Sequence, residues 1–157
     1  MIILTDTREQ APYLFTGYEV QVEPATLPVG DYSIPGFMDR VSIERKSLDD
    51  LIGCLTTGRD RFEKELRRAR SYGFFAVVVE GSLSDIYQGM YTSNMAPQSA
   101  LQSILAFTIR YGTNFIWAEN RQGGEYVTHG LLSKYLREIG ERFKAATKAQ
   151  AEREMSI

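Results

Sequence analysis

A chain of 157 residues is long enough for one ordinary domain with a full hydrophobic core and too short for two of comfortable size. Hydrophobic residues make up 43% of it and charged residues 24%, as in soluble globular proteins, and no apolar run approaches the roughly 20 residues of a membrane span. The formal net charge of -2 argues against nonspecific binding of nucleic acid over the whole surface, but it leaves room for a local basic face.

Strands and helices are predicted to alternate along the chain. Short apolar runs and runs with a period of two predict strands at residues 2–5, 18–23, 31–34, 40–45, 74–79 and 115–118. Helical periodicity, with Ser, Pro or Gly near the ends, predicts helices at residues 47–56, 59–72, 82–88, 97–111 and 124–146. This order predicts an α/β fold whose central sheet is flanked by helices on both faces and is mixed, because the third and fourth strands form a hairpin.

One domain is expected over residues 1–146, followed by a charged C-terminal tail over residues 147–157 that frays. The reactive residue types are too few for several common kinds of active site. Cys54 is the only cysteine, which excludes an internal disulfide and a cysteine-rich zinc site, and its apolar neighbours indicate a buried side chain. His129 is the only histidine and lies far from the other candidate catalytic residues, so a histidine-based triad is unsupported. Because Asp6 comes too soon for a secretory signal, a cytoplasmic protein is expected.

Acidic and basic side chains gather around the predicted hairpin. Asp31 begins its first strand, and Glu44 and Lys46 end its second, two residues apart. Since successive side chains of a strand point to opposite faces, Glu44 and Lys46 emerge side by side while Val41 and Ile43 point to the core. Two carboxylates can hold a hard divalent cation, and a lysine beside them can orient a water and offset phosphate charge. The pattern is one that metal-dependent phosphodiester hydrolysis needs, but taken alone a solvated charge cluster at a strand end is the commoner interpretation, and further motifs must decide between them.

Three further residues have both a functional and a structural interpretation. Asp6 ends the first strand, where α/β sheets place ligand groups, but an aspartate there can also cap a turn. Asp50 follows Ser47 by three residues, which also suits a helix capping box. Arg59 begins a helix whose N–H groups favour phosphate, although a solvated arginine is the alternative. Residues 59–70 carry six basic and three acidic side chains, which makes this helix the candidate basic face.

Taken together, these residues resemble the nuclease domain of the XPF-type structure-specific endonucleases. The motifs that carry the resemblance are Asp6-x-Arg8-Glu9, Gly30-Asp31-Tyr32, Ile43-Glu44-Arg45-Lys46-Ser47-x-x-Asp50, Gly58-Arg59 and Val79-Glu80-Gly81. The resemblance covers most of the chain. It implies a restriction-endonuclease-like fold and metal-dependent cleavage of branched DNA, such as flaps, forks and junctions, in repair or recombination.

The resemblance also implies roles for individual residues. Asp31 and Glu44 would bind Mg²⁺, with Mn²⁺ able to substitute, and Asp6 would be a further direct or water-mediated ligand. Lys46 would position the attacking water and the phosphate. The residues expected to bind DNA or to support the site are Arg8, Glu9, Arg45, Asp50, Arg59 and, from the same basic helix, Arg67. The arginines would either contact phosphates or hold the acids by hydrogen bonds.

A homodimer is expected, because the helices at 97–111 and 124–146 carry more apolar residues than one face needs. The resemblance points the same way, since nuclease domains of this family pair through late helices. Family members usually carry helix-hairpin-helix motifs after this domain, and none is recognisable here. A nucleoid-associated location would follow for a prokaryotic or phage source. Two alternatives stay open: a non-catalytic DNA-binding partner subunit of the same fold, which the intact acids and Lys46 oppose, and a nuclease with little preference for DNA structure.

Overall fold

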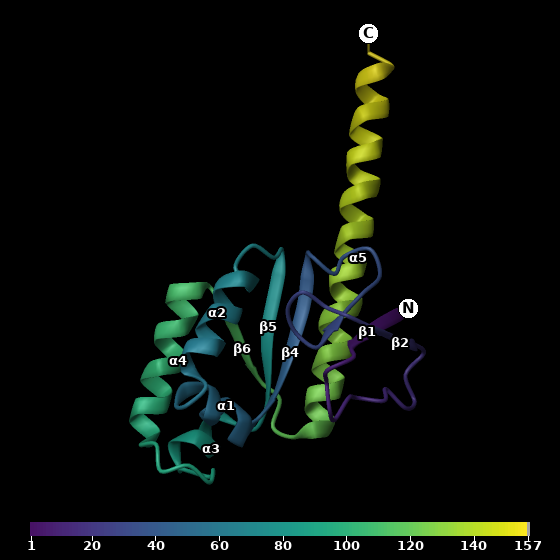
Figure 1. Ribbon diagram of the computed structural model, residues 1–157. Coiled ribbons are helices and arrows are strands. Elements are labelled where there is room, and N and C mark those ends of the chain that lie inside the picture. The colour runs from purple at the N-terminus through teal and green to yellow at the C-terminus, as the bar shows by residue number, and fades with distance from the viewer. Residues whose placement is uncertain (157) are drawn as a thin grey trace.

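The computed structural model describes residues 1–156 as a six-stranded sheet between two layers of helix (Figure 1). The strands are β1 Ile2–Asp6, β2 Gln21–Ala25, β3 Tyr32–Ser33, β4 Val41–Ser47, β5 Phe74–Glu80 and β6 Asn114–Trp117. The helices are α1 Leu48–Leu55, α2 Arg59–Ala69, α3 Leu83–Tyr87, α4 Pro97–Tyr111 and α5 Arg121–Glu154. The predicted α/β fold is confirmed. Among these helices, none combines the length and the apolar composition that a bilayer crossing needs.

The strands follow the order β2-β1-β3-β4-β5-β6 across the sheet. β3 is antiparallel to β1 and to β4, whereas the other neighbouring pairs are parallel, so the sheet is mixed as predicted. The antiparallel pairs include the predicted hairpin, and the parallel pairs on the β5 side need the crossovers through α1–α2 and α3–α4. Because β1, β4 and β5 run in the same direction, their carboxyl ends meet at one edge, where α/β sheets place their ligands.

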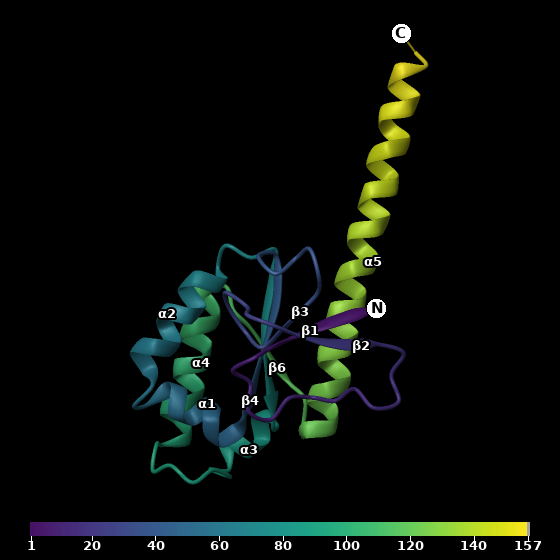
Figure 2. The ribbon, with the colours of Figure 1, turned by 45° about the vertical axis from the view of Figure 1, so that its right-hand side comes forward.

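β5 separates two hydrophobic cores, which explains its uninterrupted apolar sequence. Val77 and Val79 enter the core formed with α1, α2 and α4, while Ala76 and Val78 enter the core formed with α5 and the segment after β1. Figure 2 shows α1, α2 and α4 on one side of the sheet and α5 on the other. A strand that is covered on both faces cannot carry polar side chains at alternate positions without burying them.

β2 is the strand that differs most from its predicted position. It begins at Gln21 rather than at residue 18, because Val20 donates its N–H to the Tyr18 carbonyl 2.9 Å away in a turn before the strand starts. It pairs with β1 only and lies at the edge of the sheet. Pro24 has no N–H to donate and therefore suits an edge position.

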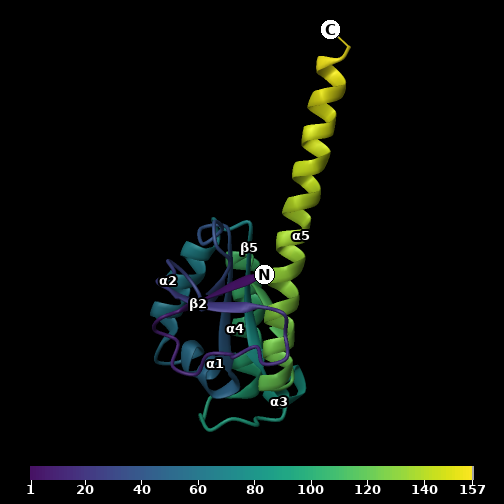
Figure 3. The same cartoon turned by 90° about the vertical axis from the view of Figure 1, so that its right-hand side faces the viewer.

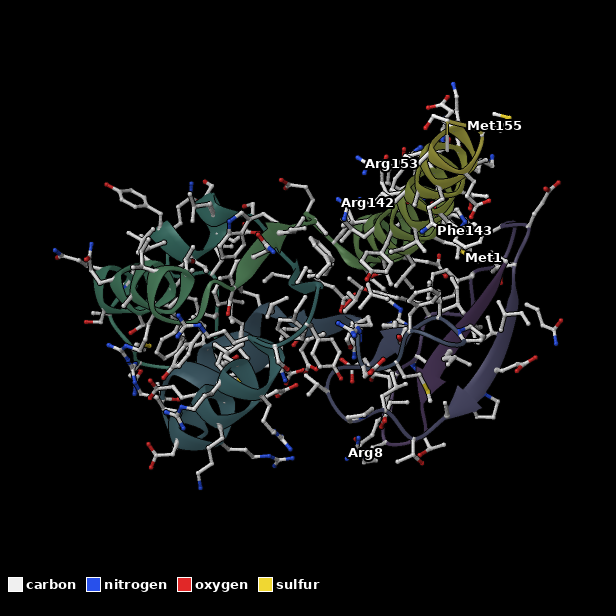
Figure 4. All side chains as sticks on the ribbon, turned by 90° about the horizontal axis from the view of Figure 1, so that it is seen from above. Met1, Arg8, Arg142, Phe143, Arg153 and Met155 are labelled. Atoms are coloured by element: carbon white, nitrogen blue, oxygen red, sulfur yellow. The ribbon has the colours of Figure 1, made fainter. Side chains whose placement is uncertain are left out.

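α5 is longer than predicted at both ends. Asn120 caps its start by accepting the Gly123 N–H at 2.8 Å. Its C-terminal part projects from the body of the domain (Figures 1 to 3), and the predicted tail from residue 147 continues the helix to Glu154. Good helix formers and a Lys148–Glu152 ion pair at helical spacing support this part without tertiary packing. Its Phe143 and Met155 lie exposed along the projection (Figure 4). Ile157 lies outside the described residues.

Candidate active-site cleft

The Gly-Asp pair places a carboxylate beside β4 through a conformation that requires glycine. Gly30 has φ = 78°, and a Cβ at this position would lie 2.0 Å from Ser42 Oγ. The backbone therefore passes close over β4, where the Asp31 N–H donates to the Ile43 carbonyl at 2.8 Å. β3 and β4 pair only at Tyr32 and Ile43, and beyond that point the Asp31 side chain continues the ladder, its Oδ2 accepting the Arg45 N–H at 2.8 Å.

Glu44 and Lys46 lie on one face of β4, as predicted. The Lys46 Nζ is 3.0 Å from Glu44 Oε1, and both side chains are largely buried. Val41 and Ile43 point to the opposite face and enter the α5 core. The alternation of the strand therefore brings a carboxylate and an ammonium group to the side of the sheet that carries α1 and α2.

These side chains line a cleft of about 390 Å³ beside the carboxyl end of β4. Its acidic residues are Asp6, Asp31, Glu44 and Glu65. Its basic residues are Arg8, Lys46, Arg61 and Arg68. Arg8 lies at the margin of the molecule away from the projecting part of α5 (Figure 4). The deepest groups are the acids and Lys46, whereas the arginines are exposed to solvent.

Burial and mutual repulsion disfavour ionised carboxylates at the base of this cleft. Burial, with a further contribution from the Glu44 charge, raises the pKa of Asp31 from 3.8 to about 8. Burial also raises the pKa of Glu44, and the nearby Glu65 adds to the rise. Burial alone would lower the pKa of Lys46, but the neighbouring groups, with the Glu44 carboxylate first among them, together outweigh it and the pKa rises, so Lys46 stays protonated. The pair of acids would therefore gain from a bound cation.

The residues present fit a divalent cation with oxygen ligands. Among residues 1–156 no group of three or more His, Cys, Asp or Glu side chains is placed to hold a metal ion. Mg²⁺, however, usually keeps several waters and binds through one or two protein carboxylates together with substrate phosphates. Asp31 and Glu44 are two such carboxylates on one cleft wall. The donor set suits Mg²⁺ or Mn²⁺ and does not suit a soft metal.

Asp6 lines the cleft but its carboxylate is already engaged. Oδ1 accepts the Arg8 backbone N–H at 2.9 Å and the Arg8 Nε–H at 2.7 Å, and Oδ2 accepts from Arg8 Nη2 at 2.9 Å and from the Leu27 N–H at 2.7 Å. Burial by itself would raise the pKa of Asp6, yet these donors outweigh it and the pKa is lowered. In this geometry Asp6 anchors Arg8 and the Leu27 segment at the cleft rim, and its predicted direct ligation would cost hydrogen bonds.

Arg45 points away from the cleft, to the α5 side of the sheet. Its guanidinium group pairs with Glu9, at 3.3 Å, and with Glu80. Of the two roles left open for Arg45 by the sequence, the geometry favours holding acids by hydrogen bonds over contacting a phosphate. Glu9 lies on the same side, where its carboxylate accepts two hydrogen bonds from Arg45.

Three further predicted DNA-binding or supporting residues, in addition to Glu9 and Arg45, lie outside the cleft. Asp50 is exposed in the first turn of α1, where its N–H donates to Ser47 Oγ at 3.1 Å, so the capping interpretation describes it better. Arg59 packs over the Phe107 ring, 4.8 Å from its centroid, and donates to Ser103 Oγ at 2.9 Å. Arg67 is exposed beside α4. α2 packs against α4 as well as facing the cleft, and Arg59 and Arg67 lie on its α4 side.

The cleft side of α2 carries Arg61, Glu65 and Arg68, none of which was among the predicted site residues. Their spacing of four and then three residues places them on one stripe of a helix. Phe62, Leu66 and Ala69 form the neighbouring buried stripe. The sequence shows both stripes, but charged residues surround the apolar one on both sides. Only the packing of α2 beside β4 decides which charged side faces the acids.

Comparison with known proteins shows the family to which this chain belongs. A family model described as "ERCC4 domain" matches residues 5–129. The chain is 26% identical to DNA repair endonuclease XPF of Mus musculus over 115 residues, which are 71% of this chain and 12% of that protein. It is 41% identical to DNA repair protein RAD1 of Saccharomyces cerevisiae over 61 residues, 37% of this chain and 5% of that protein. The chain thus spans a small fraction of the length of these relatives.

Two solved structures of XPF from Aeropyrum pernix share the fold. One has a TM-score of 0.69 and 23% sequence identity, with 92% of this chain and 69% of that chain covered. The other, a complex with DNA, has a TM-score of 0.67 and 25% identity, with 87% and 66% covered. The predicted restriction-endonuclease-like fold is confirmed by this likeness. With its sequence matched over residues 5–129 and its fold shared with the XPF nuclease domain, the chain belongs to the ERCC4 domain family.

Proposed function

We propose that this protein is a divalent-cation-dependent DNA endonuclease that hydrolyses phosphodiester bonds in branched DNA. The observation that carries the proposal is the buried Asp31–Glu44 pair with Lys46 at hydrogen-bonding distance, in one cleft bordered by exposed arginines. Membership of the ERCC4 domain family supports it, as do relatives that are named DNA repair endonucleases and a similar structure that is a complex with DNA.

Each group in the cleft has a distinct task in this reaction. Asp31 and Glu44 would hold the cation, which when bound lowers the pKa of a water and offsets charge on the scissile phosphate. Lys46 is protonated and close to Glu44, so it can donate a hydrogen bond to a phosphate oxygen and orient the attacking water. Arg8, Arg61 and Arg68 surround the cleft and can bind neighbouring phosphates of the DNA backbone.

A panel of labelled substrates tests the proposed substrate class. The protein is incubated with flap, fork, Holliday-junction and linear duplex DNA of equal length and shared sequence, each in Mg²⁺, Mn²⁺ or EDTA. Cleavage near the branch point in either metal, with little cleavage of the linear duplex, is expected. Equal cleavage of all four substrates would leave the endonuclease proposal standing and overturn its preference for branched DNA.

Arg61 and Arg68 are expected to contact the DNA backbone. Binding affinity is measured against salt concentration for Arg61→Ala and Arg68→Ala, and each lost phosphate contact should lower the log–log slope by about one. Arg67→Ala is the matched control, because it removes the same charge from the same helix outside the cleft. If the slope falls for Arg67→Ala and not for the cleft variants, the DNA-binding side of α2 is the side of Arg67, as the sequence alone suggested.

We further propose that the protein forms a two-fold dimer through α4, β6 and the first half of α5. α4 buries Ile104 and Phe107 but leaves Leu105 59% and Ile109 86% exposed. The core therefore does not cover all the apolar side chains of this helix. An apolar groove of about 660 Å³ runs between α4 and α5 over β6, the edge strand of the sheet. Exposed apolar surface of this kind beside an open sheet edge marks an interaction surface.

Sedimentation velocity at micromolar concentration tests the dimer. A dimer is expected for the wild-type protein, and Leu105→Lys should shift it to monomer because a charge would be buried in the interface. Leu14→Lys, which changes a 74% exposed leucine in the segment after β1, should leave the dimer intact. A wild-type protein that sediments as a monomer at this concentration would contradict the dimer.

A further inference from the structure

A buried cluster of charged side chains lies on the face of β4 opposite the cleft. Arg45 of β4 sits between Glu9, from the segment after β1, and Glu80, the last residue of β5. The three side chains are 11%, 7% and 8% exposed. Buried charges of this kind are stable only when each has its partner, since a lone buried charge is costly.

Glu80 is the residue of this cluster that joins the most elements. Besides Arg45 it accepts a hydrogen bond from the Tyr13 hydroxyl at 3.2 Å, and Arg121 Nη1 at the start of α5 lies 4.0 Å from its Oε2. Arg121 in turn donates to the Pro12 carbonyl at 2.9 Å and lies over the Tyr13 ring. One carboxylate therefore connects β4, β5, α5 and the segment after β1.

The geometry points to Glu80 as a positioning residue for the cleavage reaction, acting through Arg45 on the acids of the cleft. This inference rests on the proposed function. The Arg45 backbone N–H donates to Asp31 Oδ2 at 2.8 Å, so the residue that Glu80 holds by its side chain also holds Asp31 by its main chain. Side chains alternate along β4, so fixing the direction of Arg45 also fixes those of Glu44 and Lys46 on the opposite face.

Glu80 is better placed for this task than Glu9. It belongs to β5, which pairs with β4 along its whole length in the register Lys46↔Val79 and Ser47↔Glu80, so its backbone is rigidly placed relative to Arg45. Glu9 lies outside the sheet and reaches Arg45 with two contacts of 3.3 Å, which are long for charge-assisted hydrogen bonds. Glu80 does not line the cleft, so its loss should affect the acids without removing a DNA contact.

Glu80→Gln, which keeps the size and removes the charge, tests the inference, with Glu80→Asp as the conservative variant. Three quantities are measured: the exchange rate of the Arg45 amide by NMR, the affinity for Mn²⁺ by titration calorimetry, and kcat and KM on a labelled flap substrate. Phe107→Leu in the other core is the control for lost stability that leaves the charged cluster intact. All variants are compared at temperatures where they are equally folded.

Glu80→Gln should speed exchange of the Arg45 amide, weaken Mn²⁺ binding and lower kcat by about 10- to 100-fold, with KM unchanged within about two-fold. Glu80→Asp should recover part of each loss, and Phe107→Leu should show none of them. Values for Glu80→Gln that match those of Phe107→Leu would overturn the positioning role. If the wild-type protein cleaves no DNA, the proposed function fails, but the Arg45 amide exchange still decides whether Glu80 holds Arg45 against Asp31.

Discussion

Asp31→Asn and Glu44→Gln are each expected to abolish DNA cleavage while leaving the fold and most of the DNA binding in place. Each change removes one of the two carboxylates that can hold a cation and keeps the shape of the side chain. In Asp31→Asn the amide oxygen of the introduced asparagine can still accept the Arg45 N–H, so the local backbone has no reason to move. Binding should persist, because the exposed arginines that surround the cleft supply the phosphate contacts.

The stability of the metal-free Asp31→Asn variant provides an independent check of the same site. Folding raises the pKa of Asp31 from 3.8 to about 8, so the wild-type protein loses stability as the pH rises through this range and Asp31 must ionise in the folded state. An asparagine does not titrate, and the variant should therefore melt at a higher temperature than the wild type at pH 8 in EDTA. Full cleavage activity in Asp31→Asn or in Glu44→Gln would rule out the assigned cation site.

Lys46→Ala is expected to lower kcat by about 10²- to 10³-fold, the usual cost of removing one positioned donor to a transition-state charge. The ammonium group is 3.0 Å from Glu44 Oε1 and largely buried, and a neutral water that enters the space left by the truncation does not restore its charge. KM for DNA should change little, because the exposed arginines and not Lys46 form the outer phosphate contacts.

Lys46→Met is the companion variant, since it fills the same volume and separates the loss of charge from the creation of a cavity. Both variants should lose kcat to a similar degree. If instead KM rises and kcat is preserved, Lys46 is a phosphate anchor and takes no part in the chemical step. Arg67→Ala, outside the cleft, should leave both constants unchanged.

The deepest part of the site could be predicted from sequence because it depends on local rules. The alternation of β4 places Glu44 and Lys46 together whatever surrounds them, and a glycine before Asp31 signals a close approach of the backbone. Helix α4 was predicted with its bounds of Pro97 and Tyr111, because a proline suits the first turn of a helix. In the structure Gly112, with φ = 63°, ends the helix.

The rim of the site could not be predicted because it depends on which elements pack together. Charged residues lie on both sides of the apolar stripe of α2, and nothing within the helix distinguishes Arg68, at the cleft, from Arg67, beside α4. Nothing in the sequence indicates that the Asp6 carboxylate has partners, but in the fold it accepts hydrogen bonds from Arg8 and from the Leu27 N–H. The charged cluster around Arg45 likewise depends on contacts between segments up to 109 positions apart in the sequence.

The metal dependence of the cleft is tested by cleavage of a labelled flap substrate by the purified wild-type protein, first in Mg²⁺, then in excess EDTA and then with Mg²⁺ restored. Asp31→Asn is run beside it to exclude a contaminating nuclease. We expect a product in the first and third conditions, none in EDTA, and none from the variant in any condition. A product that forms in EDTA, or that Asp31→Asn makes as fast as the wild type, would contradict the claim that these carboxylates form a metal-dependent nuclease centre.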